Sequence, residues 1–332
     1  MSGRSKNKTT LKDIALATGF TVNTVSHALN DKPDISEGTK LLIRRKADEL
    51  GYVRNTVASS MRTGYTKTLA VIMSDISNPF FGIMVKLIEN YARKYDYNTI
   101  IINTDEDATL EMYAINSALE KKVDGIILCP SQKTHEPIDF LKNSGCPFVL
   151  LGRHFSDPDV DFVSSDDVTG AFLATEYFIG QGCRRILHLG GPSYISSSTE
   201  RLAGYKQALR KHGIPYSGKL VRRVPVTGGR CTSVFKKLSQ EKISYDAILA
   251  FSDLVALEVL AILQKTGQEA NVPIIGYDNI LSNMQLPYPL SSIGYDKSEL
   301  AEQLVSILLH KIRNDTAPKT MQIFLPTHLV LR

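Results

Sequence analysis

The chain has 332 residues, of which 43% are hydrophobic and 22% charged, and its formal net charge is +5. This length and composition predict two or three globular units with real cores. They exclude a membrane protein, because no apolar run approaches the ~18 residues that a spanning helix needs. The basic start MSGRSKNKTT also lacks the apolar core of a signal peptide, so we expect a cytoplasmic protein.

The positive charge is concentrated at the amino-terminal end. Residues 1–64 contain 11 Lys/Arg and 6 Asp/Glu, whereas the remaining residues contain 28 of each kind. An excess of positive charge on one segment is typical of a surface that meets phosphate.

Residues 10–62 have the pattern of three short helices. Thr10 can cap the first helix together with Asp13, and Gly19 suits the left-handed residue that ends a helix. Thr21 can cap a second helix, and a basic third helix follows. This layout is typical of a helix-turn-helix unit that places its second helix in the major groove of DNA. A plain three-helix bundle with a basic surface is the alternative.

The second helix sorts its residues onto two faces. The face predicted to point inward consists of Val25, Ala28 and Leu29. The outward face consists of Val22, Asn23, Ser26 and His27. Asn23 comes early in the helix, where base edges are reached.

After this segment, short apolar runs alternate with amphipathic helical stretches. The runs are LAVIM (69–73), TIIIN (99–103), GIILC (125–129), FVLL (148–151), RILHL (185–189), AILAF (247–251) and PIIGY (273–277). Runs of this kind predict strands buried on both faces of parallel sheets, in a doubly wound α/β arrangement. Two sheets are needed to hold them all, and the first series ends near residues 164–167.

These patterns carry a resemblance to a known family. The segments TLKDIALATGFTVNTVSHALN and DISEGTKLLIRRKADELGY resemble the head of the lactose repressor/galactose repressor (LacI/GalR) family. The resemblance continues in order through DISNPFFG, VDGIILCPS, RILHLGGP, ERLAGYKQAL, FSDLVAL, IIGYDN and LPTHLVLR. It implies an α/β protein with an N-terminal helix-turn-helix three-helix head. The core would be periplasmic-binding-protein-like, with two doubly wound parallel-sheet lobes.

The resemblance also implies a domain plan. The DNA-binding head would take residues 1–54, and a hinge helix with its linker would take 55–67. The first lobe of the core, which carries dimerisation and part of the effector site, would take 68–163 with 295–318. The second lobe would take 164–294 with 319–332.

The hinge segment is too short to hold a helix in water unaided, so we expect it to fold only when bound. In the resembling family a hinge helix orders on the operator and wedges an apolar side chain into the minor groove. Met61 stands where most relatives have Leu, and Arg54 where many have Pro. Asn55 and Ala58 are further expected DNA contacts. A plain linker is the alternative.

Three side chains of the head are the expected base readers. Val22 offers a methyl surface for thymine, and Asn23 suits adenine. His27 stands where family members often carry Arg, and it would make a single hydrogen bond to a purine acceptor or contact phosphate only. The residues expected to position the DNA backbone are Thr10, Thr21, Thr24, Ser26 and Asn30. Arg44, Arg45 and Lys46 are expected on a solvated face.

Polar residues that follow strands are the candidates for a ligand site, because ligands bind there in open α/β sheets. By resemblance, the effector would contact Asp75, Asn78, Phe80, Ser131, Arg153, Arg201, Asp253 and Asp278. Phe81 is expected in the core. Arg201 could instead be a surface charge, and Asp253 could cap the helix that follows it. Asp166 and Asp167 are further candidates.

The expected function is that of a ligand-responsive transcriptional repressor, which binds a pseudo-palindromic operator as a homodimer. The effector would be a small molecule, by default a sugar or sugar derivative. An effector-free regulator, one with a nucleobase corepressor and one with a protein co-regulator are the alternatives, as is a solute-binding protein of the same fold. We expect no enzyme, metal or cofactor, since G-x-S-x-G, P-loop, H-E-x-x-H and G-x-G-x-x-G patterns are missing from the sequence. The four cysteines lack metal-site spacing, which favours reduced structural thiols.

Overall fold

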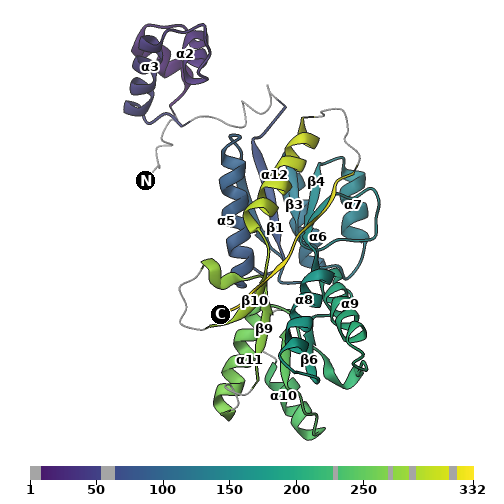
Figure 1. Cartoon of the computed structure of the whole chain (residues 1–332). Helices are drawn as coiled ribbons and strands as arrows, with labels where there is room; N and C mark the ends of the chain where they lie inside the picture. Colours follow the sequence, from purple (N-terminus) through teal and green to yellow (C-terminus); the bar gives the residue numbers. More distant parts are fainter. Residues whose placement is uncertain (1–8, 54–63, 227–230, 268–271, 284–288, 314–319) are drawn as a thin grey trace, which may run out of the picture. The chain divides into compact units, whose positions relative to one another are not determined.

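The computed structural model describes residues 9–53, 64–226, 231–267, 272–283, 289–313 and 320–332. The chain divides into two compact units, Met1–Tyr65 and Thr66–Arg332, here called the head and the core (Figure 1). No helix in these described ranges combines the length and the apolar character that crossing a bilayer requires.

The described part of the head, residues 9–53 and 64–65, contains three helices, and the caps predicted from the sequence are present. The helices are α1 (Leu11–Thr18), α2 (Val22–Leu29) and α3 (Glu37–Glu49). The backbone N–H of Thr10 donates to Oδ2 of Asp13 over 2.7 Å, and Gly19 takes a φ of 74° after α1. The Thr24 backbone N–H donates to the Thr21 hydroxyl over 3.1 Å at the start of α2. The two hydrogen bonds set where α1 and α2 begin, and the left-handed backbone of Gly19 sets where α1 ends.

A small apolar core fixes which face of α2 points outward. Its fully buried side chains are Ile14, Val25, Ala28 and Ile43, one or two from each helix. Leu29 is partly buried against the same cluster. The predicted inward face of α2 is therefore confirmed, and the opposite face is left for contacts outside the head.

The first sheet of the core has six parallel strands in the order β11-β5-β4-β3-β1-β2. Their bounds are β1 (Thr68–Met73), β2 (Asn98–Asn103), β3 (Gly125–Leu128), β4 (Phe148–Leu151), β5 (Phe162–Ser165) and β11 (Gln322–Leu325). The helices packed on it are α5 (Pro79–Arg93), α6 (Ala108–Glu120), α7 (Glu136–Ser144) and α12 (Lys297–Ile312).

Alternate residues of β1 face opposite sides of this sheet. Leu69 and Val71 belong to the cluster that contains the buried residues of α5 and α12. Ala70 and Ile72 belong to the cluster formed with α6 and α7. Because the strand is covered on both faces, its run of apolar residues is uninterrupted.

The second sheet has the order β12-β10-β9-β8-β6-β7, in which β12 is antiparallel to β10. Its strands are β6 (Ile186–Gly190), β7 (Val221–Arg223), β8 (Ala247–Ala250), β9 (Ile274–Tyr277), β10 (Ser291–Gly294) and β12 (His328–Val330). The associated helices are α8 (Asp167–Gly180), α9 (Ser196–Lys211), α10 (Cys231–Gln240) and α11 (Asp253–Thr266). Two 3-10 turns, η1 (Gly218–Leu220) and η2 (Ile280–Asn283), complete it.

The chain passes between the two sheets three times: after β5, between β10 and α12, and between β11 and β12. The expected division at 163/164 falls inside β5, which belongs to the first sheet through Ser165. The assignment of 319–332 to the second lobe is also corrected, because β11 pairs in parallel with β5. Pro326 separates β11 from β12, and a proline cannot donate to a strand ladder, so two short strands form here in different sheets.

All seven apolar runs picked out from the sequence form strands, with ends shifted by at most one residue. Strands β5, β7, β10 and β11 were not predicted. Their sequences contain serine, arginine or glutamine. Strands β7, β10 and β11 are also short and only partly buried, and β7 and β11 lie at sheet edges. Such strands form through pairing with neighbours rather than through an apolar run of their own.

Helices α8 and α9 approach so closely that a side chain at Gly204 has no room. A Cβ atom there would stand 2.0 Å from the Val168 carbonyl oxygen. We expect Gly204→Ala to push the helices apart and lower the free energy of unfolding by about 1–3 kcal/mol. Gly82→Ala in α5 is the matched control, since nothing lies within 4 Å of a Cβ at that position. Thermal denaturation should show a loss for the first variant only, and equal melting temperatures would contradict the close contact.

Candidate functional site

The outward face of α2 presents the residues expected to read DNA. Val22 is 41% exposed, Asn23 is exposed, and Ser26 and His27 are half-buried. At the carboxyl end of the helix, the Asn30 side-chain amide donates to the Ser26 carbonyl over 2.6 Å. The Asn30 side chain therefore closes the end of α2.

The His27 ring has a partner inside the head. Its Nδ1 lies 2.6 Å from Oδ2 of Asp34, in the segment between α2 and α3. The hydrogen bond from His27 lowers the pKa of Asp34 below its usual value, so the carboxylate is ionised at neutral pH. The side chains remain 35% and 55% exposed.

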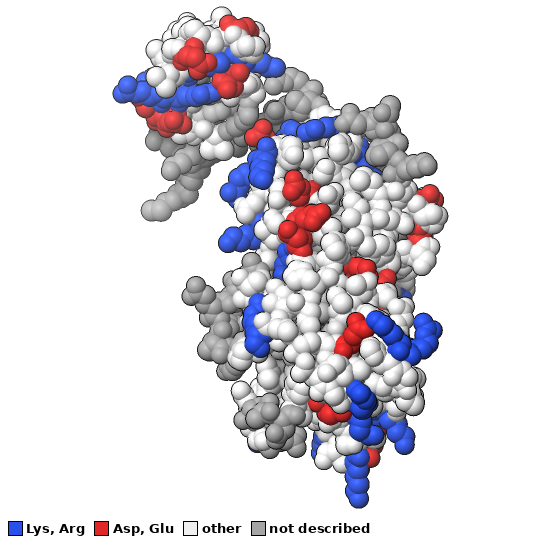
Figure 2. All heavy atoms as spheres, viewed as in Figure 1, with Lys and Arg blue, Asp and Glu red and all other residues white. Residues whose placement is uncertain are grey.

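The basic residues of α3 form ion pairs with acids of the head. Arg44 lies 2.8 Å from Asp31, and Arg45 and Lys46 lie 3.3 and 2.7 Å from the two oxygens of Glu49. Figure 2 shows blue and red side chains side by side on this unit. The solvated face expected for these residues agrees with this pairing. Arg54 and the residues expected to contact DNA from the hinge, Asn55, Ala58 and Met61, lie outside the described residues.

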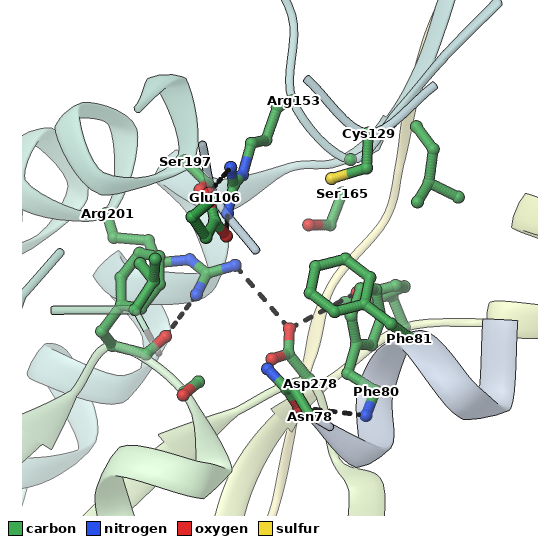
Figure 3. Close-up of a pocket in the computed structure, with 16 residues that line it drawn as sticks. Asn78, Phe80, Phe81, Glu106, Cys129, Arg153, Ser165, Ser197, Arg201 and Asp278 are labelled. Carbon is green, nitrogen blue, oxygen red and sulfur yellow. Dashed lines mark hydrogen bonds and ion pairs between the residues drawn. The ribbon is translucent and has the colours of Figure 1, made fainter. Parts of the chain in front are cut away.

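A cavity lies between the two sheets of the core (Figure 3). It contains about 570 Å³ of space between the atoms, part of it open to solvent. Its lining consists of Asn78, Phe80, Phe81, Glu106, Cys129, Leu151, Gly152, Arg153, Ser165, Ser197, Arg201, Val226, Phe251, Ser252, Asp278 and Tyr295. The sequence predicted five of these as ligand contacts, namely Asn78, Phe80, Arg153, Arg201 and Asp278. They come from loops and helices separated by up to 200 residues in the chain.

Arg153 enters the cavity from the end of β4 with its charge already balanced. Its two terminal nitrogens donate to the two carboxylate oxygens of Glu106 over 2.7 and 2.6 Å. Nη1 also donates to the Pro130 carbonyl over 2.9 Å. A bidentate pair of this geometry fixes both side chains.

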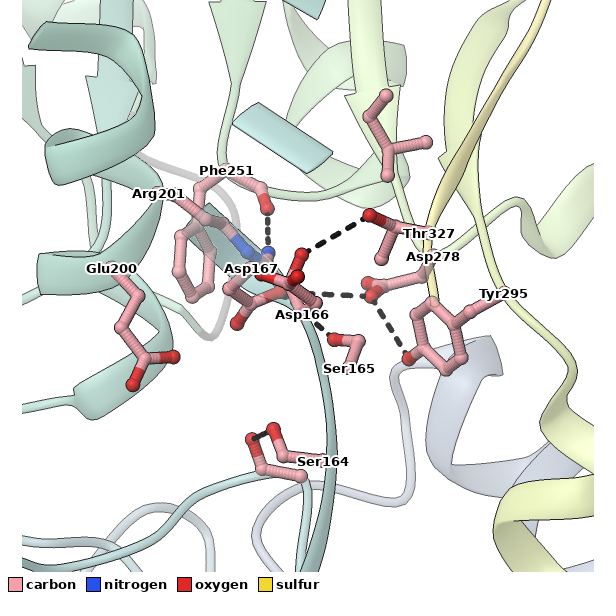
Figure 4. Close-up of polar contacts among 12 residues, drawn as sticks. Ser164, Ser165, Asp166, Asp167, Glu200, Arg201, Phe251, Asp278, Tyr295 and Thr327 are labelled. Atoms are coloured by element: carbon pink, nitrogen blue, oxygen red, sulfur yellow. Dashed lines mark hydrogen bonds and ion pairs between the residues drawn. The ribbon is translucent and has the colours of Figure 1, made fainter. Parts of the chain in front are cut away.

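Arg201 comes from α9 and is only 7% exposed (Figure 4). Its Nη1 donates to the Phe251 carbonyl, and its Nη2 lies 3.3 Å from Asp167 and 3.8 Å from Asp278. The guanidinium carbon stands 3.5 Å from the centroid of the Tyr277 ring. The possibility that Arg201 is a surface charge is therefore wrong.

The two carboxylates beside Arg201 are buried, and burial raises the pKa of each. The pKa of Asp167 rises to about 6, with Arg201 opposing part of that rise. The pKa of Asp278 rises for the same reason. Asp278 has a φ of 90°, and Glu106 has one of 57°. Two of the three acids beside the cavity arginines, Glu106 and Asp278, thus have left-handed backbone, which costs energy for residues other than glycine and is concentrated at functional sites.

The amino-terminal end of α5 forms an aromatic wall. The Asn78 side chain accepts a hydrogen bond from the Phe80 backbone N–H over 3.1 Å and so caps the helix. The Phe80 ring packs edge-on against Phe81 and Tyr295, with centroids 5.2 and 6.5 Å apart. Phe81 is buried, as expected, and it also lines the cavity.

Three residues expected to contact the ligand do not line this cavity. Oδ1 of Asp75 accepts hydrogen bonds from the backbone and side chain of Ser77 over 2.9 and 2.6 Å. Ser131 is 2% exposed, and its backbone N–H donates to Glu111 over 2.6 Å. The third residue is Asp253. Asp166, a weaker candidate, caps α8 by accepting from Thr169 over 2.9 Å.

Asp253 joins three segments of the second lobe. Its Oδ1 accepts from the Ser292 hydroxyl over 2.6 Å, and its Oδ2 accepts from the Ile280 backbone N–H over 2.7 Å. Burial raises its pKa to about 7. The suggestion that Asp253 caps α11 is wrong, because the Ser252 side chain takes that place.

Polar contacts also join the two lobes beside the cavity. The Ser196 backbone N–H at the start of α9 donates to the Gln132 side chain over 2.9 Å. One turn later, Glu200 lies 2.7 Å from Nε2 of His154, which follows β4. These contacts hold the amino-terminal end of α9 against the loops of the first lobe.

Sequence reasoning missed several lining residues, including Glu106, Ser197, Phe251 and Tyr295. Glu106 follows a predicted strand, so the rule that located Asp75 and Arg153 could have found it. Tyr295 follows β10, which was not predicted. Phe251 was assigned to the end of a strand, where its carbonyl proved to be the atom that contacts Arg201.

Two family models match the chain. Residues 10–55 match bacterial regulatory proteins of the lacI family. Residues 66–327 match the periplasmic binding proteins and sugar binding domain of the LacI family. Together these matches span both the head and the core.

Curated relatives and solved structures are similar to the chain over both of these regions. Catabolite control protein A of Priestia megaterium is 31% identical, over 93% of this chain and 95% of its own. The transcriptional repressor PurR of Photobacterium profundum is 28% identical, over 92% of each chain. A complex of the regulator CelR with cellobiose has a TM-score of 0.74 at 25% identity, covering 98% of this chain and 99% of CelR. The lac repressor dimer bound to operator has the same fold, with a TM-score of 0.83 at 22% identity over 98% of each chain. The chain belongs to the LacI family, whose members are DNA-binding transcriptional regulators with a ligand-binding domain.

Proposed function

We propose that this regulator is a cytoplasmic repressor that binds a pseudo-palindromic operator as a homodimer. When a small neutral carbohydrate occupies the cavity, the repressor either releases the operator or binds it more tightly. Residues 1–54 form the DNA-binding head in this proposal, and 55–67 form a hinge that orders on DNA. The observation that carries the proposal is a cavity whose two arginines are already matched by carboxylates.

On DNA, the outward face of α2 lies in the major groove. Val22, Asn23 and His27 contact base edges, and Thr10, Thr21, Thr24 and Ser26 position the sugar-phosphate backbone. Asn55, Ala58 and Met61 contact the minor groove from the hinge, and Met61 is the wedge. The exposure of Val22 and Asn23 in the structure supports this arrangement.

The dimer contact lies on the first lobe. Strand β2 is at the edge of its sheet, and Ile101 on that strand is 49% exposed. Tyr113 and Leu110 on the neighbouring helix α6 are 70% and 42% exposed. An apolar face at a sheet edge is a self-complementary surface that a second copy of the chain would cover. The lac repressor dimer of the same fold supports this occupant.

The charge balance of the cavity favours a neutral ligand. Arg153 is bound to Glu106 through two hydrogen bonds, and Arg201 faces Asp167 and Asp278. A phosphate or carboxylate would have to displace a buried acid, which is costly. Sugar hydroxyls can instead donate to the carboxylates and accept from the arginines, while Phe80 offers a ring face to the apolar side of the sugar. The cellobiose complex of CelR supports this class.

Ligand and operator are coupled through the lobes. A molecule that bridges Arg153 of the first lobe and Arg201 of the second changes the angle between the lobes. This rotation alters the spacing of the two hinges in the dimer, and with it the stability of the hinge helices on DNA. Such coupling is reciprocal and is typically about 1–3 kcal/mol.

A thermal-shift screen of the full chain tests the ligand class. Neutral mono- and disaccharides, their phosphates and purine bases form the three arms. We expect a neutral sugar to raise the melting temperature, because a ligand at 100 times its Kd adds about 2.7 kcal/mol to the stability. A shift with phosphorylated sugars only, or with purines only, would contradict the neutral carbohydrate. The purine arm is included because PurR is among the relatives.

A further inference from the structure

One of the proposed base-reading side chains, His27, makes a contact inside the head with Asp34. His27 lies on α2, the helix that faces the groove, whereas Asp34 lies in the segment before α3. Nδ1 and Oδ2 are 2.6 Å apart. Two cations of α3, Lys40 and Arg44, pair with Asp31 instead, over 3.1 and 2.8 Å.

This contact decides which ring atom faces DNA and in what form. An ionised carboxylate can only accept a hydrogen bond, so Nδ1 of His27 must carry the proton. In the neutral ring, Nε2 then has a lone pair and is an acceptor. Without Asp34, nothing else in the described head fixes the tautomer, and Nε2 could donate as well as accept.

We propose that Asp34 is a positioning residue that sets base specificity by holding the His27 ring with Nδ1 as the donor and Nε2 as the atom that meets the base edge. The inference rests on the proposed operator binding. In the neutral ring, Nε2 accepts from an amino group in the major groove, which adenine and cytosine present and guanine and thymine do not. This acceptor role replaces the hydrogen bond to a purine acceptor that the sequence suggested for His27. Asp34 itself touches no base in this proposal.

A purely electrostatic role for Asp34 would predict a different effect of its removal. A carboxylate close to DNA repels phosphate, so its loss should strengthen binding to every sequence. The positioning role predicts a loss of discrimination at one position of each half-site. The two explanations therefore differ in what changes, which is the affinity for every sequence in the first and the preference for one base in the second.

Sequence selection from duplexes with a random window of about 20 bp, room for two half-sites one turn apart, tests the role. The assay runs at about pH 8, where an imidazole is ordinarily neutral. Asp34→Ala removes the acceptor, whereas Asp34→Asn removes the charge but keeps a carbonyl oxygen that can accept from Nδ1. Asp48→Ala on α3 is the control for lost charge, since Asp48 is exposed.

We expect the wild-type chain to select adenine or cytosine at one position of each half-site. Asp34→Ala should lower that preference by about 10-fold, which lies within the usual cost of one mismatched pair. Asp34→Asn should retain most of the preference, and Asp48→Ala all of it. His27→Ala should lose the same preference as Asp34→Ala.

The proposal is overturned if Asp34→Ala selects the wild-type sequence with undiminished preference, or if Asp34→Asn and Asp34→Ala lose it equally. Circular dichroism shows whether Asp34→Ala keeps its helices, and Asp34→Asn decides the matter if it does not. A wild-type chain that selects no sequence at all would instead contradict operator binding, so failure of the proposed function is distinguishable from failure of this inference.

Discussion

Replacement of Arg201 with alanine is expected to lower the free energy of unfolding of the core by about 3–5 kcal/mol and to abolish the response to ligand. The side chain is 7% exposed and faces two buried carboxylates, Asp167 and Asp278. Its removal deprives both acids of the cation that most lowers their pKa values. The loss of stability appears in thermal melts, and the loss of response appears in gel shifts with and without the sugar.

A second substitution separates the two effects. Asp167→Asn in the Arg201→Ala background removes one unpaired charge, so it should restore part of the stability without restoring the response. Lys206→Ala is the matched control, since this lysine is an exposed residue of the same helix. A variant with Arg201→Ala that melts like the wild type and still responds to sugar would refute the role given to this arginine.

An aspartate in place of Ile101 is expected to separate the dimer and weaken operator binding by about 10²–10⁴-fold. Ile101 is 49% exposed on the edge strand β2, so the folded core tolerates a charge there, whereas an interface between two copies does not. Two linked heads bind with an effective concentration that separate heads lack, which sets the size of the loss. Analytical ultracentrifugation and operator titration measure the two quantities.

Tyr216→Asp provides the comparison for this surface. Tyr216 is 48% exposed but lies on the second lobe, away from β2 and α6. It should leave both the dimer and operator affinity unchanged. If Ile101→Asp remains dimeric, or if Tyr216→Asp dissociates equally, the dimer contact lies elsewhere.

The head could be predicted almost completely from the sequence because its determinants are local. A capping pair at Thr10 and Asp13, a left-handed Gly19 and a cap at Thr21 each act within a few residues. The apolar positions of α2 follow from helix periodicity alone. Local patterns do not identify the partner of His27, because Asp34 lies beyond the end of α2 and contacts the ring through the turn between α2 and α3.

The core was predictable only where strands are apolar throughout. The cavity depends on atoms brought together by tertiary structure, such as the Phe251 carbonyl and the carboxylate of Glu106. Asp253 follows a strand just as Arg153 does, yet it faces Ser292 inside the second lobe rather than the ligand space. The rule that ligands bind after strands therefore located the correct end of the sheets, where the strands finish. It did not distinguish the residues that line the cavity from those that face the inside of a lobe.

The resemblance implied only an effector contact for Arg201, and the structure adds a further role. That expectation treated Arg201 as a ligand contact alone. Its proximity to two buried acids makes it a structural cation as well, so activity assays on this variant need a measure of folded protein beside them.

The pairing of β11 and β12 in different sheets bears on how the chain is made. During synthesis, the ribosome releases β1 to β5 long before β11, yet the first sheet lacks its edge strand until Leu325 has emerged. The second sheet likewise waits for His328–Val330. The two sheets therefore receive their last strands within a few residues of each other, first β11 and then β12. A nascent chain that has emerged from the ribosome only as far as residue 321 would therefore have two sheets that each lack one strand, and its protease sensitivity should fall for both lobes in a single late step.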